Sequence, residues 1–304
     1  MTDQVKIEAA MTLTAESMRL AKNVESLLSQ ILPPKIWDAD LYVFRHSPEA
    51  QKDPIVFCWL KLAGAVATVV PTCSLMAAGF CFAAVILARS VWEAVLSITF
   101  MLPNPNIPDW PNEKQKKALS NFYTEIWDDH LKPYETTKKI SQIPLKYLCA
   151  AWGNIAGALP GLNPHDMTQT ARQHMSCDSN YTHMGYPALM ELFREDPVRL
   201  RGKESTHAYF TLQHAVTSLN SVCYATSLIL DTQVKDLQKK SDGPTVVRLI
   251  ATCRQQQRKI EAISQRLTTG FGLNCDSTKL LRAMKTGKPI DDLLNPNHSE
   301  RPTP

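Results

Sequence analysis

The stretch of sequence that decides the fold covers residues 63–102 and reads AGAVATVVPTCSLMAAGFCFAAVILARSVWEAVLSITFML. It is almost wholly apolar, and its two charged residues, Arg89 and Glu93, stand four positions apart. A helix that is apolar on nearly every side is typical of a buried position. We therefore predict a central helix over residues 75–102 and an all-α fold, a helical bundle built around it.

The same stretch is long enough to raise the question of a membrane span, since about 20 apolar residues cross a bilayer. Pro71 interrupts its weakly apolar first half, and the stronger half, residues 75–88, ends at Arg89. Placing Arg89 or Glu93 in lipid would cost roughly 2.5–3.5 kcal/mol each. We predict a buried core helix and no membrane span. Hydropathy alone does not decide whether residues 63–88 contact a membrane.

The composition is that of an ordinary globular protein, with 304 residues, 44% apolar and 20% charged. The net charge of +4 is too mild to demand an anionic partner. The eight cysteines include no Cys-x-x-Cys pair, so we expect neither a disulfide framework nor a zinc cluster. Acidic residues near the N-terminus argue against a signal peptide. Cytoplasmic localisation and the absence of a cofactor or metal are our expectations.

Helical periodicity and breaking residues organise the rest of the chain. A first helix, residues 4–32, carries an apolar stripe of Ile7, Met11, Met18, Ala21, Leu28 and Ile31. Pro71 either kinks a second helix, residues 55–69, or opens the next one. Further helices are predicted over residues 113–131, 145–159, 188–193, 205–240 and 245–269, and one from Met167, where Asp166 and Gln169 form a capping box. We predict one helical domain over residues 1–270, followed by short helices and a loose tail over residues 271–304.

Arg89 and Glu93 form the first candidate site. On a helix they lie one turn apart, on the stripe of Leu75, Gly79, Phe82, Ile86, Leu96 and Phe100. Charge on that stripe is costly unless it is paired. One interpretation is a buried ion pair that fixes helix register. The other is a polar site inside the bundle, with Glu93 as base or ligand and Arg89 as an anion clamp.

Tyr181 and His183 form the second candidate site, in the segment DSNYTHMGYP at residues 178–187. Before a proline, His183 can cap the last carbonyl groups of a helix, and Tyr181 can bury its ring. The competing interpretation places both side chains against Glu93. A carboxylate, an imidazole and a phenol would then surround one pocket.

These two segments together carry a resemblance. Leu-Ala-Arg89-Ser90-Val-Trp-Glu93-Ala94, paired with the downstream Asn-Tyr181-Thr-His183-Met-Gly-Tyr186-Pro187-Ala-Leu-Met, resembles a bacterial helical family of unknown function. Its signatures are an Arg-Ser-x-x-Glu-Ala helix and a Tyr-x-His segment, and the likeness covers about residues 60–235. The resemblance implies an α-helical bundle with Arg89, Glu93, Tyr181 and His183 as signature positions. It implies no activity.

A looser likeness is to HEPN domains, helical bundles that include RNA-cleaving enzymes. In those enzymes an Arg, then four to six residues, then a His lie on one helix. Only Arg201-Gly-Lys-Glu-Ser-Thr-His207 has that spacing here, and Gly202 with a cap at Ser205 places Arg201 before the helix. A HEPN-like site would instead combine Arg89, Glu93 and His183. His207 and His214 lie about 10–11 Å apart along a helix axis, which favours a polar stripe over a metal site.

The last predicted helix is basic, with Arg248, Arg254, Arg258, Lys259 and Arg266 against Glu261 alone. Such a face is usually solvated, but it could bind RNA in a salt-dependent manner.

Two hypotheses for function follow. One is a cytoplasmic defence or stress protein, HEPN-like and RNA-cleaving, that uses the Arg-Glu-Tyr-His cluster. The other is a non-catalytic interaction or scaffold module in which the cluster only fixes packing. Oligomeric state stays open.

Overall fold

The computed structural model describes residues 3–31, 53–103, 109–131, 143–157, 162–183, 207–239 and 243–270. In these residues all regular structure is α-helix, and no strand is present, which confirms the all-α prediction. The helices are α1 (Asp3–Ile31), α4 (Pro54–Ala77), α5 (Cys81–Met101), α6 (Glu113–Leu131), α7 (Leu145–Ala156), α8 (Pro164–Thr182), α10 (His207–Lys239) and α11 (Pro244–Gly270). The predicted helix over residues 188–193 and the tail over residues 271–304 lie outside the described residues.

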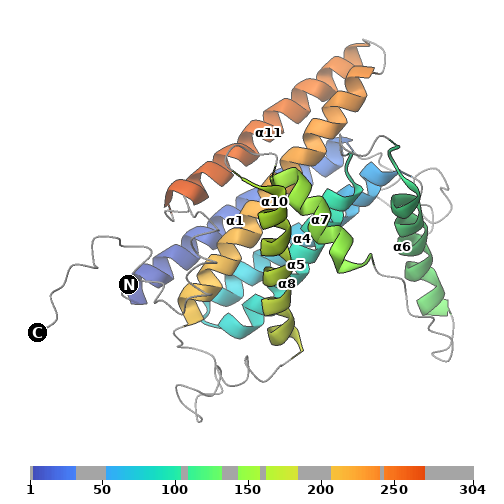
Figure 1. The fold of residues 1–304 in the computed structure, drawn as a ribbon. Coiled ribbons are helices and arrows are strands. Elements are labelled where there is room, and N and C mark those ends of the chain that lie inside the picture. Colours follow the sequence, from blue (N-terminus) through green and yellow to red (C-terminus); the bar gives the residue numbers. More distant parts are fainter. Residues whose placement is uncertain are drawn as a thin grey trace, which may run out of the picture.

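The bundle is organised around α4 and α5, which a short turn joins into a hairpin (Figure 1). The long helix α10 packs on both of them, and α1 lies along α4. Helix α11 returns alongside α10 and also contacts α1. Helices α7 and α8 pack on each other and on α5, while α6 touches the bundle through α4.

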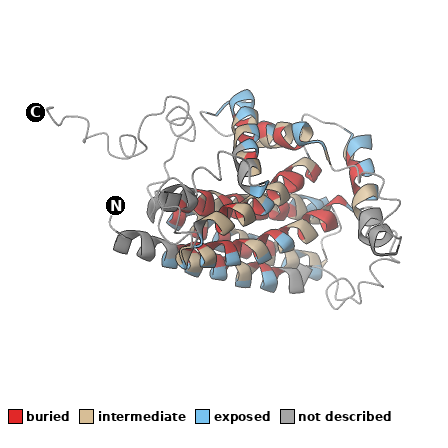
Figure 2. Ribbon diagram, turned by 90° about the horizontal axis from the view of Figure 1, so that it is seen from below, coloured by how far each residue is buried: buried red, intermediate tan, exposed pale blue. Residues whose placement is uncertain are grey.

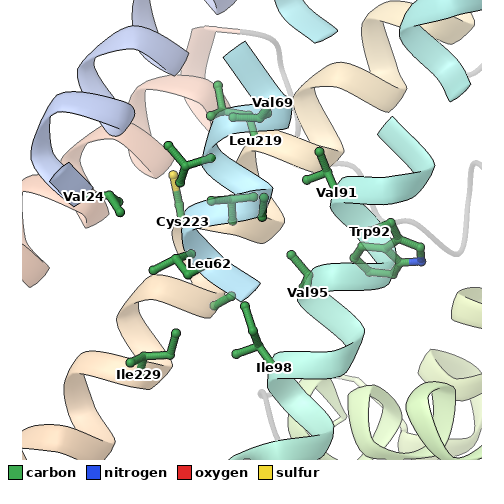
Figure 3. Packing of buried hydrophobic residues seen from close by; sticks show 14 of the residues in the cluster. Val24, Leu62, Val69, Val91, Trp92, Val95, Ile98, Leu219, Cys223 and Ile229 are labelled. Carbon is green, nitrogen blue, oxygen red and sulfur yellow. The ribbon is translucent and has the colours of Figure 1, made fainter. Parts of the chain in front are cut away.

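The core is one hydrophobic cluster to which α1, α4, α5, α10 and α11 all contribute. Buried residues line the facing sides of these helices, and exposed residues lie on their outer sides (Figure 2). In Figure 3, Leu62 and Val69 from α4 approach Leu219 and Cys223 from α10. The same view includes Val24, Val91, Val95, Ile98 and Ile229, so four helices meet at the centre.

The central helix is shorter than predicted, because α4 ends before residue 81 in a Schellman motif. Gly79 adopts a positive φ of 85°, which glycine accepts at little steric cost. The Gly79 N–H donates to Met76 O (3.0 Å), and the Phe80 N–H donates to Leu75 O (2.8 Å). The prediction of one helix over residues 75–102 is therefore wrong at its start. Gly79 ends a helix instead of extending an apolar stripe.

Helix α4 is longer than predicted, since Pro71 lies inside it. Asp53 caps the start of the helix: its Oδ1 accepts from the Ile55 N–H at 2.8 Å, and Pro54 takes the first helical position. It runs to Ala77, so Pro71 does not open the next helix. Of the two predicted alternatives, the one in which Pro71 opens the next helix is therefore wrong.

Two of the described helices, Pro54–Ala77 and Phe82–Met101, are long and apolar enough to cross a membrane by length and composition. The central helix continues through Arg89 as predicted, since α5 runs to Met101. In the most apolar 18-residue windows, 50% of the α4 residues and 67% of the α5 residues are buried inside the structure. Core helices of soluble proteins pass the same test, so two such helices are weak evidence for a membrane.

The predicted helix at the N-terminus is present as α1, but its buried face differs from the predicted stripe. Met11 is 64% exposed and Met18 is 53% exposed. The buried face consists of Leu13, Glu16, Ser17, Leu20, Val24 and Leu27. A glutamate occupies the core side of this helix because an arginine from α11 neutralises it, as described below.

The starts of α6 and α8 show how local side chains place helix ends. At α6, Asn112 Oδ1 accepts from the backbone of Gln115 (3.0 Å), whose side chain accepts from the Asn112 N–H (2.8 Å). This is a reciprocal capping box. At α8, Asn163 Oδ1 accepts from the His165 N–H at 2.8 Å, and Pro164 takes the first position. The predicted start at Met167 is wrong, since Asp166 lies within the first turn.

Candidate functional site

Arg89 and Glu93 form an ion pair along one turn of α5. The Arg89 Nε and Nη2 groups both donate to Glu93 Oε1, each at 3.2 Å. The Arg89 side chain is 18% exposed, whereas the Glu93 side chain is 47% exposed. The pair predicted from sequence is therefore formed, but it lies at the edge of the core instead of inside it. Ion pairs at such accessible positions contribute about 0–1 kcal/mol.

The pair lies at the edge because the core side of α5 is a different stripe. Ala84, Ala88, Val91 and Val95 are fully buried. Of the predicted stripe on α5, Leu96 is fully buried as well, but Phe82, Ile86 and Phe100 are only partly buried. The Ser97 hydroxyl donates to Glu93 O at 2.7 Å, which adds a link within the helix. Among the described side chains, the third guanidinium nitrogen of Arg89, Nη1, is buried and has no hydrogen-bond partner.

The other two predicted site residues lie at the end of α8. Its last residue is Thr182; His183 follows in a turn, is exposed, and donates its backbone N–H to Ser179 O at 3.0 Å. Tyr181 belongs to the last turn of α8, and its side chain lies outside the described residues. The structure thus brings Arg89 and Glu93 together, and the described contact of His183 is with its own helix.

Helix α8 contacts α5 through a different residue, His174. Its ring lies 5.3 Å from the Trp92 ring, centroid to centroid. Trp92 points to the opposite side of α5 from Val91 and Val95 (Figure 3). His183 lies about 13 Å further along the α8 axis than His174, at about 1.5 Å per residue. The described ring contact between α8 and α5 is made by His174, and the side chain of Tyr181 lies outside the described residues.

Five rings from four helices meet at this junction, and we call them the aromatic junction. Trp92 of α5 packs edge-on against Trp152 of α7, with ring centroids 4.8 Å apart. Trp152 in turn meets Tyr224 of α10 at 5.8 Å. His174 meets His214 of α10 at 4.6 Å, the shortest of these separations. Edge-to-face ring pairs contribute about 0.5–1.5 kcal/mol beyond their buried area.

The electrostatics of the junction keep its titratable groups neutral near pH 7. Burial lowers the pKa of His174 to about 4. Burial, and then the charge of His174, lower the pKa of His214 well below its usual value. Burial also raises the pKa of Tyr224. The Trp92 indole N–H is buried and has no hydrogen-bond partner among the described residues.

From the sequence, His214 was singled out but His174 was not, and the contact between them was not predicted. His174 continues the buried positions of α8, Met167, Ala171 and Met175, and that periodicity was the available signal. His214 was paired in sequence with His207, whose side chain lies outside the described residues. Within the described part of the chain, no group of three or more His, Cys, Asp or Glu residues could hold a metal ion.

A second buried charge lies between α1 and α11. Glu16 is 4% exposed and accepts two hydrogen bonds from Arg266, from Nε at 2.9 Å and from Nη2 at 3.0 Å. Arg19 adds a third at 2.6 Å. Burial alone would raise the pKa of Glu16, but the hydrogen bonds and charges of Arg266 and Arg19 lower it overall. This arrangement explains why a glutamate occupies the inner side of α1.

The same contact uses part of the basic face predicted on α11. Arg266 is bound to Glu16, and Arg254 lies 3.8 Å from Asp231 of α10. The basic face, expected from the sequence to be solvated or to bind RNA, therefore keeps Arg248, Arg258 and Lys259 exposed to solvent.

The described cysteines, Cys58, Cys73, Cys149, Cys223 and Cys253, are free and buried. Burial raises the pKa of each thiol, which leaves it in its unreactive protonated form. These thiols therefore act as small apolar side chains.

Comparisons of the chain with protein-family models, with curated proteins and with solved structures give no significant match. Any function assigned to this chain therefore has to be argued from its own residues.

Proposed function

We propose that this protein is a cytoplasmic, non-catalytic interaction module that associates through the outer side of α4. The observation that carries the proposal is the side of α4 that faces solvent. Its exposed residues are Gly64, Ala67, Pro71 and Ser74, which we call the α4 outer face. None of them is charged, whereas exposed helix faces in globular proteins are normally charged or polar.

The polar groups on this side of α4 are already satisfied within the helix. The Ser74 hydroxyl donates to Val70 O at 3.0 Å, and the Thr68 hydroxyl donates to Gly64 O at 2.8 Å. Lys61 is the only charged residue of α4, and its Nζ lies 5.0 Å from the ring centroid of Phe122 of α6. Covering the α4 outer face would therefore remove few hydrogen bonds to water. Its small residues would let another helix approach closely.

The geometry around Arg89 supports a structural role for the predicted cluster. Arg89 and Glu93 pair within one helix, and Glu93 is nearly half exposed, so neither needs a ligand to neutralise it. Helix α8 packs on α5 through His174, about 13 Å along its axis from His183. These observations favour the scaffold interpretation of the cluster over a pocket that gathers a carboxylate, an imidazole and a phenol.

Because small residues suit helix–helix contact, we infer that the first partner is a second copy of the chain. The test is the mass of the purified protein in solution by light scattering. We expect an oligomer for the wild type and a monomer for Ala67→Lys and Ser74→Lys. Gln255→Lys, which adds the same charge at an exposed position of α11, should stay oligomeric. A wild type that is monomeric at every accessible concentration contradicts the proposal, and binding to lipid vesicles contradicts its cytoplasmic part.

A second candidate function is a HEPN-like, RNA-cleaving defence or stress protein, in line with the resemblance to a bacterial helical family. The buried, unpartnered Nη1 of Arg89 favours it, because a guanidinium with a free donor can hold a phosphate. The exposed Arg248, Arg258 and Lys259 could contact RNA backbone. In this candidate, Glu93, His183, Arg89 and Tyr181 would form the active site.

Expression of the wild type and of Glu93→Ala and His183→Ala distinguishes the two candidates. The scaffold proposal predicts intact RNA and normal growth in every case. It also predicts that Glu93→Ala lowers the free energy of unfolding by less than about 1 kcal/mol, since the pair is accessible. RNA degradation by the wild type, abolished in variants that keep wild-type stability, would establish the ribonuclease instead.

A further inference from the structure

Large apolar side chains that face solvent gather on α1 and at the end of α4. Among the described residues the exposed ones are Met11, Met18, Phe80, Leu145, Leu162 and Val247. Met11 and Met18 belong to α1, and Phe80 lies in the turn between α4 and α5. Exposed apolar side chains that gather in one place mark sites of association, whereas single ones need no explanation.

Helix α1 lies beside the last turns of α4. The two helices pack along each other (Figure 1), and a side-chain hydrogen bond joins Ser17 to Cys73. The residues that follow these two, Met18 and Ser74, are both exposed. Met11 lies two turns before Met18, on the same side of α1. Both helices pack on α10 with their inner sides, so their outer sides turn away from the core together.

The two outer sides have complementary shapes. On α1, the long side chains of Met11 and Met18 are 64% and 53% exposed. The α4 outer face carries only short side chains, at intervals of three, four and three residues, which is the spacing of a helix–helix seam. Methionine is flexible enough to fill irregular gaps between small residues. The methionines of one surface therefore fit the α4 outer face of another.

We propose that the second copy binds through a two-fold contact in which Met11 and Met18 of each copy pack on the α4 outer face of the other. This inference rests on the proposed function and names the surface that the partner uses. In a two-fold contact the same surface serves both copies, so it needs a projecting part and a receiving part. The outer sides of α1 and α4 supply one each.

The charges on this surface suit a contact between identical copies. The α4 outer face is uncharged, and the outer side of α1 carries Lys22 and Glu25, which are exposed and opposite in sign. Arg19 is also exposed and is paired with Glu16. Two copies therefore meet without an excess of like charge. Lys22 and Glu25 follow Met18 by one and two turns, and a polar rim beside an apolar centre is typical of protein interfaces.

Cross-linking between two different variants of the full chain tests the contact directly. One chain carries Met18→Cys and the other carries Ala67→Cys, so a link between positions 18 and 67 can only join two copies. After treatment with a short bismaleimide and digestion, mass spectrometry should find peptides that join these positions. In the control mixture, Val247→Cys on α11, where the native side chain is 59% exposed, replaces Met18→Cys. We expect no link between positions 247 and 67.

Light scattering over a range of concentrations gives the second measurement. Met18→Lys should raise the dissociation constant of the oligomer about a hundred-fold, which is about ten-fold for each of the two copies of this side chain in the contact. Met11→Lys should act in the same direction. Val247→Lys places the same charge at an exposed apolar position of α11 and should leave the dissociation constant unchanged.

The outcomes separate this inference from the proposed function. If Met18→Lys stays oligomeric while Ala67→Lys is monomeric, the α4 outer face associates with a different surface and the two-fold contact is wrong. An oligomeric mixture without links between positions 18 and 67 also overturns it. A wild type that is monomeric throughout overturns both proposals. If circular dichroism shows that Met18→Lys does not fold, the cross-linking decides.

Discussion

Glu16 shows at the scale of one residue how a buried carboxylate is stabilised. Its two oxygens accept from Arg266 and Arg19, and these contacts lower its pKa below the usual 4.5. Because the folded pKa is lowered, the stabilisation is present above about pH 4.5 and is lost as the pH falls through the folded value. Acid should therefore loosen the contact between α1 and α11.

Glu16→Gln tests this contact. The substitution keeps the shape but removes the charge-assisted hydrogen bonds, so the free energy of unfolding near pH 7 should fall by about 1–3 kcal/mol. The difference from wild type should shrink as the pH drops below about 4.5. Urea unfolding at several pH values measures it. Glu25→Gln, exposed on the same helix, is the control; a Glu16→Gln protein as stable as wild type at pH 7 would refute the account.

For single residues, the sequence predicted the ion pair of Arg89 with Glu93 correctly, but it did not predict how exposed the two side chains are. Arg89 and Glu93 are one turn apart on any helix, so their contact follows from spacing alone. Their position at the core edge depends on which stripe of α5 faces α4, and adjacent stripes of an apolar helix look alike. The pairing of His174 with His214 depends on two helices meeting, and spacing along the chain carries no such information.

Helix ends and helix contacts are the features that matter at the scale of elements. Most helices were predictable from periodicity and breaking residues, with α6, α10 and α11 close to their predicted bounds. The errors came from local chemistry that competes with the apolar pattern. Gly79 closes α4 through its positive φ, and Asn163 caps α8 one turn before the predicted cap. On α1, the partner of Glu16 is distant in sequence, so its buried face was misjudged.

Gly153→Ala and Gly64→Ala form a matched pair of glycine substitutions on helices. At Gly153 the added methyl meets Thr168 and Pro164, so we expect a loss of about 1–3 kcal/mol in unfolding free energy. At Gly64 nothing of the same chain lies within 4 Å of the added Cβ, so at concentrations where the protein is monomeric the higher helix propensity of alanine should add about 0.5–1 kcal/mol. Thermal and urea unfolding measure both. Equal effects of the two substitutions would contradict the close packing of α7 on α8.

For the whole molecule, the fold class followed from composition and pattern, but the arrangement did not. An apolar stretch such as residues 63–102 has to be covered, and a bundle is the simplest way to cover it. Which helix covers which side is decided by pairs such as Trp59 with Gln233, whose side chains hydrogen-bond between α4 and α10 at 3.1 Å. Such pairs are far apart in sequence, so a single chain does not reveal them.

The α4 outer face is the property of the whole molecule on which the proposed function depends. Three sides of α4 are covered by α1, α5 and α10, and its remaining side carries Gly64, Ala67, Pro71 and Ser74. If a second copy covers this side, association stabilises the folded state by mass action, and the melting temperature depends on protein concentration.

Thermal unfolding over about a hundred-fold range of protein concentration is therefore the most direct test of the account. The account predicts that the melting temperature of the wild type rises with concentration, whereas that of Ala67→Lys stays constant. A wild-type melting temperature that does not change with concentration, or an Ala67→Lys protein that follows the wild type, would contradict it.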